Sequence, residues 1–325
     1  MSDLNPDQQY FAEEFYEDYR EGLLSRRDFI KKLAYVVGSM AATATLMSQL
    51  GCSADELPAT TEPMPTPASA KPTTDPSTAA LVLVPGAQSP LSQPEGAPGM
   101  TTGVVTFASD GTEINGYLAR PTATGPHPAI LVCHENRGLN DHIRDVARRF
   151  AHEGYVALAV DLLAREGGAA AQDAAQIPGL LGAPGPERHV ADFRAALDYL
   201  QTLDDVAGDR IGMTGYCFGG GITWDTAIAE PRLKAAVPFY GRAPELANVA
   251  DIQAAILAVY AEQDSRINAG IPALEEALDA AGVTYQVNIY PGVNHAFHND
   301  TGNRYVEAQA TQAWQDTLAW FGTYL

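Results

Sequence analysis

The sequence predicts an α/β domain in which helices cover both faces of a mostly parallel β-sheet. From about residue 101 onward, short apolar runs alternate with segments of helical spacing. Several of the runs are apolar without interruption, as expected for strands that are buried on both faces. Because this alternation continues to residue 325, one domain accommodates it.

The domain is expected to open with an antiparallel hairpin. Residues 104–107 and 114–118 are its strands, and Asp110-Gly111-Thr112 supplies the turn. The rest alternates, with strands predicted at 129–133, 155–160, 211–216, 235–240, 256–260 and 285–290, and helices at 145–152, 190–203, 271–281 and 306–324.

The bulk composition excludes some classes of function. The formal net charge is −20 and the sequence pI is about 4.6, which argues against nucleic acid as a partner because phosphate binding needs clustered Lys and Arg. Three cysteines do not make a disulfide framework. The histidines outside the motifs described below have no ligand spacing, so neither a metal site nor a cofactor is predicted.

Residues 1–52 are predicted to be an export segment. Ser25-Arg26-Arg27 precedes a weakly polar run at 33–51, a pattern typical of a twin-arginine signal. The twin-arginine translocation machinery is therefore an expected partner, and the protein is expected in an extracytoplasmic location such as the periplasm. The acidic stretch at 13–18 is unusual for a leader. A membrane anchor formed by 33–51 stays open, although its polar residues weaken a spanning prediction.

The next segment, 53–100, is predicted to be a tether rich in Pro, Thr and Ala. Such a composition buries too little apolar surface to offset its conformational entropy. Cys52, just before it, only partly resembles a lipoprotein acylation site, because Gln49 and Leu50 do not fit that pattern. The folded domain is accordingly predicted to span 101–325.

The candidate nucleophile is Cys217, in Gly215-Tyr216-Cys217-Phe218-Gly219. Glycines on both sides suit the tight turn between a strand and a helix that presents a nucleophile. The helix start is expected to favour the thiolate and to leave a donor for an oxyanion. Taken alone, the pentapeptide fits a buried structural cysteine equally well.

Two further residues follow in the order that this kind of site requires. Asp264 comes just after the predicted strand 256–260, and His295 comes just after the strand 285–290. Singly, the first reads as a helix cap and the second as a loop histidine. Together with Cys217 they give nucleophile, acid and base at the same edge of the sheet, which favours a catalytic triad.

Over about residues 101–325 the sequence resembles the dienelactone hydrolase family. The matching motifs are His134-Glu135-Asn136-Arg137-Gly138-Leu139, Asp161-Leu162-Leu163-Ala164-Arg165, residues 215–220, the Asp264 segment, and Pro291-Gly292-Val293-Asn294-His295-Ala296-Phe297-His298. The resemblance implies an α/β-hydrolase fold and a Cys217–His295–Asp264 triad.

The resemblance also implies roles around the triad. Glu135 would lie beside the thiol and modulate it, the amides of Asn136 and Phe218 would form the oxyanion hole, and Arg165 would bind a substrate carboxylate. Without the resemblance, Glu135 reads as a loop carboxylate and Arg165 as a surface residue.

One departure from the family concerns the substrate. The family's lactone hydrolases carry a second carboxylate-binding arginine four residues past the catalytic histidine, where this chain has Asn299. His298, a candidate substrate-binding residue, or Arg304 would have to compensate. An anionic dienelactone is therefore one candidate among several small esters and lactones.

The predicted activity is hydrolysis of a small ester or lactone through a thioester on Cys217. A general carboxylesterase of the same fold is an alternative that only a substrate panel separates from it. An exported binding protein without catalysis, or a redox-sensing thiol, belongs to a different class. The latter lacks a resolving cysteine nearby, since Cys133 reads as a small core residue within a strand.

Overall fold

A computed structural model describes residues 4–49 and 83–325 of this chain. Its strands are β1 (Met100–Ser109), β2 (Thr112–Pro121), β3 (His127–Cys133), β4 (Val156–Val160), β5 (Val206–Tyr216), β6 (Ala235–Phe239), β7 (Ala255–Ala261) and β8 (Tyr285–Tyr290). Its α-helices are α1 (Pro6–Arg20), α2 (Arg26–Val37), α3 (Met40–Gln49), α4 (Asp141–His152), α5 (Ile177–Gly182), α6 (Pro186–Gln201), α7 (Phe218–Ala229), α8 (Ser265–Asn268), α9 (Ile271–Ala281) and α10 (Glu307–Tyr324).

The strands form one eight-stranded sheet in the order β1-β2-β4-β3-β5-β6-β7-β8. β1 pairs with β2 and β2 pairs with β4 in antiparallel fashion, whereas every pair from β4 to β8 is parallel. The parallel part places the carboxyl ends of β5, β7 and β8 at one edge, where ligands bind in open α/β sheets. The predicted α/β-hydrolase fold is confirmed.

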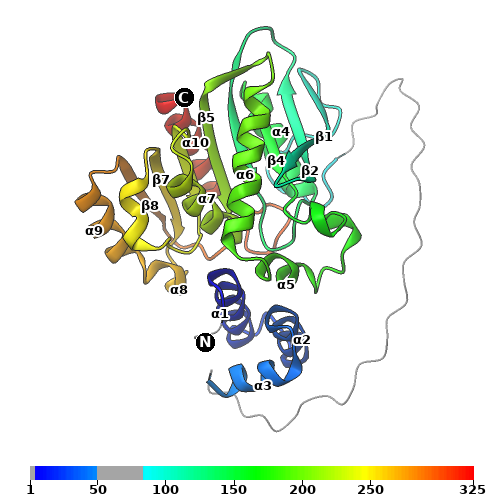
Figure 1. The fold of residues 1–325 in the computed structure, drawn as a ribbon, viewed down its shortest axis with the longest axis vertical. Helices are drawn as coiled ribbons and strands as arrows, with labels where there is room; N and C mark the ends of the chain where they lie inside the picture. Colours follow the sequence, from blue (N-terminus) through cyan, green and yellow to red (C-terminus); the bar gives the residue numbers. More distant parts are fainter. Residues whose placement is uncertain (1–3, 50–82) are drawn as a thin grey trace.

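Helices cover both faces of the sheet, with α6 and α7 on one side and α4 and α10 on the other (Figure 1). Every residue of β4, β6 and β7 is buried, which explains why these strands read as unbroken apolar runs. The predicted hairpin is also confirmed: Asp110 and Gly111 both have positive φ, as a two-residue turn of this hand requires.

The stretch before β1 is attached to the domain. The backbone amide of Gln93 donates to Asp145 Oδ1 at 2.6 Å, and Glu95 accepts hydrogen bonds from Tyr117 and Arg148 at 2.6 and 2.9 Å. The folded domain therefore begins before residue 101, and the predicted tether does not extend to residue 100. Polar contacts of this kind leave no apolar pattern in a Pro-rich sequence.

The predicted export segment contains three helices, the first of which lies against the domain beside α5 and α8 (Figure 1). α1 begins at a capping box, in which Asn5 and Gln8 satisfy each other's backbone amides, and Ser25 caps α2 at the twin-arginine motif. Across residues 4–49 and 83–325, no helix combines the length and the apolar character that a membrane crossing demands. Cys52 and the tether prediction for residues 53–82 lie outside the described residues.

Candidate active site

Cys217 occupies a strained turn between β5 and α7. Its φ is +59° and its ψ is −120°, a conformation that non-glycine residues seldom adopt. The turn is tight enough that a Cβ on Gly215 would lie 2.2 Å from the carbonyl oxygen of Gly219. This geometry aims the sulfur out of the sheet edge, as expected for a nucleophile on this type of turn.

Asp264 and His295 form a close pair at the same edge. Asp264 follows β7 and caps α8, with its Oδ1 accepting from the amide of Ile267 at 3.3 Å. Its Oδ2 lies 2.6 Å from Nδ1 of His295, which follows β8. Both side chains are buried. The carboxylate therefore fixes the orientation of the imidazole and leaves Nε2 facing the other way.

A single cavity of about 660 Å³ brings the nucleophile and the base together. Cys217, His295, Glu135 and Asn136 all line it. The cysteine sulfur lies within 4.8 Å of an imidazole nitrogen. The structure thus brings together the three residues of the predicted triad.

Helix α1 supplies two groups that contact the sulfur. The hydroxyl of Tyr10 lies 3.2 Å from Cys217 Sγ, and the carboxylate oxygens of Glu14 lie 3.8 and 4.0 Å from it. The side-chain amide of Asn136 donates to Glu14 Oε1 at 2.7 Å. Sequence reasoning assigned residues 1–52 to export and did not find these contacts. The acidic stretch 13–18, unusual for a leader, was the available signal.

The electrostatics of the sulfur differ from the sequence expectation. Burial raises the pKa of Cys217 above the ordinary thiol value, and the Glu14 carboxylate raises it further, although His295 opposes both. The expectation of a thiolate favoured by the start of α7 is therefore wrong for this state. The sulfur is enclosed by α1, and desolvation of a thiolate outweighs the helix dipole.

The contact between Asp264 and His295 favours the charged form of both side chains. Burial opposes the imidazolium, but Asp264 and the sulfur of Cys217 raise the pKa of His295 well above its ordinary value. Burial likewise opposes the carboxylate of Asp264, and the His295 contact reverses this and lowers its pKa. Each partner stabilises the charged form of the other.

Glu135 lies in the cavity, as the resemblance implied, but its hydrogen bonds go elsewhere than the thiol. One oxygen accepts from Asn299 Nδ2 at 2.5 Å, and the other accepts from the hydroxyl of Tyr240 at 3.4 Å. Its charge contributes to the raised pKa of Cys217. Asn299, at the position of the family's second arginine, is thus committed to Glu135.

Arg165 does not reach the cavity that holds Cys217. Its guanidinium donates to Asp192 Oδ2 at 2.5 Å and to Ser109. It is absent from the described residues that line that cavity. The substrate-binding role predicted for Arg165 is not supported here, because the fully buried carboxylate of Asp192 on α6 engages it.

His298 also lies away from the cavity. It is buried, its ring stacks on Tyr216 at 5.0 Å, and it packs near Trp314. Burial lowers the pKa of His298 well below the ordinary histidine value, so the ring is neutral. Its predicted role in substrate binding is not supported either: this side chain belongs to the core behind the site.

The two residues expected to form the oxyanion hole have suitable positions. Phe218 is the first residue of α7, directly after Cys217, and Asn136 follows β3 and lines the cavity. A backbone amide at a helix start carries partial positive charge and is available to a ligand. The side chain of Asn136 faces Glu14 in this structure.

The site also offers donors that metal ions bind. Ligand atoms of Glu14, Cys217 and His295 all lie within 4.8 Å of one another. Thiolate, imidazole and carboxylate are the ligands that Zn²⁺ prefers. The thiol and imidazole of this trio belong to the triad, so a bound cation would compete with hydrolysis.

Comparisons with known proteins agree with this geometry. The profile of the Dienelactone hydrolase family matches residues 114–325. A Salmonella typhi protein named "Putative carboxymethylenebutenolidase" is 37% identical over 273 residues, which cover 78% of this chain and 97% of that protein. A Methylorubrum extorquens protein of the same name is 35% identical over 241 residues, which cover 70% of this chain and 83% of that protein.

Solved structures of dienelactone hydrolase-like proteins are also similar to this chain. The "Putative Dienelactone Hydrolase" of Klebsiella pneumoniae is 33% identical, covers 69% of this chain and 99% of its own, and has a TM-score of 0.65. A dienelactone hydrolase-like promiscuous phosphotriesterase from metagenomic libraries is 26% identical, covers 70% of this chain and 99% of its own, and has a TM-score of 0.62. Pyrococcus horikoshii acylaminoacyl peptidase, at 14% identity and a TM-score of 0.57, covers 71% of this chain and 43% of its own and shares the fold.

Proposed function

Because this chain belongs to the dienelactone hydrolase family, we propose that it hydrolyses a small ester or lactone with Cys217 as the nucleophile. The observation that carries the proposal is the convergence in one cavity of a sulfur on a strained turn and an imidazole that a carboxylate orients at 2.6 Å. A nucleophile, a base and an orienting acid in this arrangement are the parts of acyl-transfer catalysis.

The proposed reaction has two halves. His295 takes the proton of the Cys217 thiol, and the thiolate attacks the carbonyl carbon. The carbon–oxygen bond of the ester breaks, the leaving alkoxide receives the proton from the imidazolium, and a thioester remains. His295 then takes a proton from water, hydroxide attacks the thioester, and the carbon–sulfur bond breaks as the departing thiolate receives the proton from the imidazolium. Asp264 holds the imidazole in the required tautomer throughout.

Amides would stabilise the oxyanion in both halves. We assign this role to the backbone amides of Phe218 and Asn136, for which removal of one donor typically costs about 3 kcal/mol of transition-state stabilisation. Glu135, held by Asn299 and Tyr240, would set the electrostatic potential at the sulfur. In this way the carboxylate modulates the thiol without a direct hydrogen bond.

The lining of the cavity, with α1 docked, does not select one charge of substrate. Its charged residues have both signs, with acids at Glu14, Asp18, Glu135 and Asp173 and bases at Lys32, Arg137 and Arg304. Arg304 is paired with Asp18 of α1 at 2.8 Å, and Arg165 is engaged outside the cavity. Small esters and lactones are therefore the proposed substrates, without a preference for charge.

The test compares Cys217→Ala with Cys133→Ala, since both thiols are buried and only the first lines the cavity. Each variant is assayed on p-nitrophenyl acetate, on a panel of lactones and on longer esters. We expect loss of turnover in Cys217→Ala and retention in Cys133→Ala, with an acyl adduct trapped on Cys217 by mass spectrometry. Equal turnover in the two variants would exclude a thioester at this residue, and the panel separates a lactone hydrolase from a general carboxylesterase.

We further propose that residues 1–52 direct export by the twin-arginine route to an extracytoplasmic location. Support comes from the Ser25-Arg26-Arg27 motif and the apolar run that follows it. Replacing both arginines by lysine and following the protein by cell fractionation tests this. Unchanged export of the variant would contradict the proposal.

A further inference from the structure

The residues closest to the nucleophile come from a helix that precedes the family-matched region. α1 ends at residue 20, whereas the family profile begins at residue 114. Two of its residues nevertheless contact the sulfur of Cys217: the Tyr10 hydroxyl lies 3.2 Å from it, and the Glu14 oxygens lie 3.8 and 4.0 Å from it. A helix outside the matched region is therefore in a position to affect the reaction at Cys217.

The geometry points to α1 as an intramolecular inhibitor, whose Glu14 carboxylate occupies the position of the acyl group beside Cys217. This inference rests on the proposed function of that cysteine. An attacked carbonyl carbon must come within about 3–3.5 Å of the nucleophile. The Tyr10 hydroxyl at 3.2 Å and the Glu14 oxygens at 3.8 and 4.0 Å fill that space.

Glu14 also has the chemistry of a reaction product. Ester hydrolysis releases a carboxylic acid next to the sulfur, and Glu14 presents a carboxyl group there, hydrogen-bonded to Asn136 at 2.7 Å. Burial raises the pKa of the Glu14 carboxyl group, and the nearby charges of His295 and Arg266 oppose this rise. The side chain is therefore a covalently tethered analogue of the product.

The same helix also changes the surroundings of the thiol. The hydroxyl of Tyr10 lies 3.2 Å from the sulfur, and the thiol donates towards the Glu14 oxygens at 3.8 and 4.0 Å. With α1 in place, burial and Glu14 hold the pKa of Cys217 above its ordinary value. Both effects lower the concentration of the reactive thiolate.

The docking of α1 combines buried apolar side chains, Tyr10, Phe11 and Phe15 among them, with three ion pairs. Phe11 stacks on Phe218 with ring centroids 5.1 Å apart, directly over the proposed oxyanion donor. The acidic residues Asp7, Glu17 and Asp18 pair with Arg242, Arg266 and Arg304 at 3.3, 3.0 and 2.8 Å. The domain thus presents a face rimmed by arginines that fits an acidic amphipathic helix.

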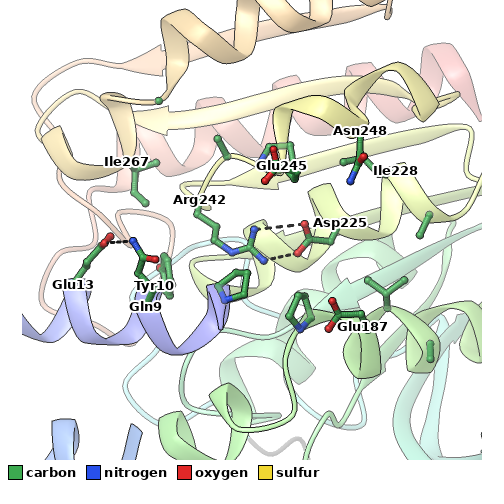
Figure 2. Close-up of a pocket in the computed structure, with 18 of the residues that line it drawn as sticks. Gln9, Tyr10, Glu13, Glu187, Asp225, Ile228, Arg242, Glu245, Asn248 and Ile267 are labelled. Atoms are coloured by element: carbon green, nitrogen blue, oxygen red, sulfur yellow. Dashed lines mark hydrogen bonds and ion pairs between the residues drawn. The ribbon is translucent and has the colours of Figure 1, made fainter. Parts of the chain in front are cut away.

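Two cavities border the docked helix. The cavity that holds Cys217 borders Glu14, Phe15 and Asp18 of α1, and a second cavity of about 820 Å³ borders Pro6, Gln9, Tyr10 and Glu13. Figure 2 shows α1 running past this second cavity, with Arg242 paired to Asp225 above it. The Glu17 and Asp18 pairs are partly exposed, and ion pairs of that kind contribute about 0–1 kcal/mol each. The attachment of α1 to the domain therefore depends mainly on its buried side chains.

The test opens the site in the full-length chain with Phe11→Asp, which places a charge against Phe218. We measure the rate of Cys217 alkylation by iodoacetamide, located by mass spectrometry, and kcat/KM on p-nitrophenyl acetate. If the open form is about 1% of the wild-type population, both quantities rise by up to about 100-fold in the variant. A synthetic peptide of residues 5–21 should reverse the rise, whereas the same peptide with Glu14→Gln and Tyr10→Phe should reverse it less.

Controls and outcomes separate this inference from the proposed function. Glu13→Gln alters the outward carboxylate that bonds Gln9, and should leave both rates unchanged. Unchanged or lower rates in a Phe11→Asp protein with the wild-type thermal transition would overturn the inhibitory role. A rise in the alkylation rate without any ester hydrolysis would support the inhibitory role of α1 and refute the proposed hydrolase activity. Hydrolysis that depends on Cys217 but is unchanged by Phe11→Asp would support the hydrolase activity and refute the inhibitory role.

Discussion

Replacing Gly219 by alanine tests whether the close approach of α7 to β3 positions the nucleophile. A Cβ at Gly219 would lie 2.5 Å from the carbonyl oxygen of His134, 2.8 Å from that of Cys133 and 2.9 Å from the Cys133 sulfur. Two of these three atoms are backbone, so no rotamer change relieves the overlap. Real Cβ contacts stay beyond 3.0 Å, so α7 must shift by at least about 0.5 Å.

The expected cost appears in both stability and rate. Overpacking of a filled core costs about 1–3 kcal/mol, and each kcal/mol lowers Tm by about 2–4 °C in a domain of this size. A misplacement of about 1 Å at a reacting group costs about 100-fold in rate, so a shift of half that size should lower kcat/KM by at least about 10-fold.

Gly103→Ala is the matched control, because nothing lies within 4 Å of a Cβ at this position in β1. It should leave kcat/KM unchanged and alter the free energy of unfolding by less than about 1 kcal/mol. Calorimetry and ester hydrolysis are compared for the two variants. If Gly219→Ala matches Gly103→Ala in both measurements, the steric reasoning is refuted.

Three further predictions concern charged groups. Asp264→Asn should lower kcat by about 10⁴-fold, because the amide favours the wrong tautomer of His295. A decrease in kcat of less than about 10-fold, measured by steady-state kinetics, would contradict the role of Asp264 in orienting His295. Arg165→Ala should leave KM unchanged but lower the free energy of unfolding, measured with denaturant, by about 3 kcal/mol or more, because the buried Asp192 carboxylate loses its partner. A raised KM in a variant of wild-type stability would instead support a substrate-binding role. Burial raises the pKa of Asp7 to about 7 against the influence of Arg242, with Asp225 and Glu187 adding to the rise and the buried His189 ring 3.9 Å away. The contribution of Asp7 to docking is therefore largest below about pH 4 and is lost as pH rises through about 7. Hydrogen exchange of α1 amides, corrected for intrinsic rates, should show this component in wild type and not in Asp7→Asn, and equal profiles would contradict it.

The fold, and the placement of Cys217, Asp264 and His295 at one edge of the sheet, were predictable because each rests on local or sequential pattern. β4, β6 and β7 are buried on both faces, and that burial imposes unbroken apolar runs. The turn at Cys217 needs glycines within two residues of it, and the chain order of nucleophile, acid and base follows from the order of the strands.

The resemblance implied roles for Glu135, Arg165 and His298, but it did not give the partners that these side chains have in the structure. A motif gives the position of a side chain along the chain, whereas its partners depend on distant elements. Asp192 on α6 captures Arg165, and Tyr216 packs against His298. The residue spacing within the segments 161–165 and 291–298 does not predict these partners.

By itself, the sequence determined the sheet, the nucleophile turn and the residues able to act on it, since these depend on short-range pattern and strand order. Only the tertiary structure decided that α1 lies over Cys217, that Glu14 and Tyr10 contact its sulfur, and that burial and Glu14 raise the pKa of the thiol. The physical reason is that a pKa and a blocked approach are set by atoms brought close in space. Here the hydrogen-bonded atoms of Tyr10 and Cys217 are 207 residues apart in the chain.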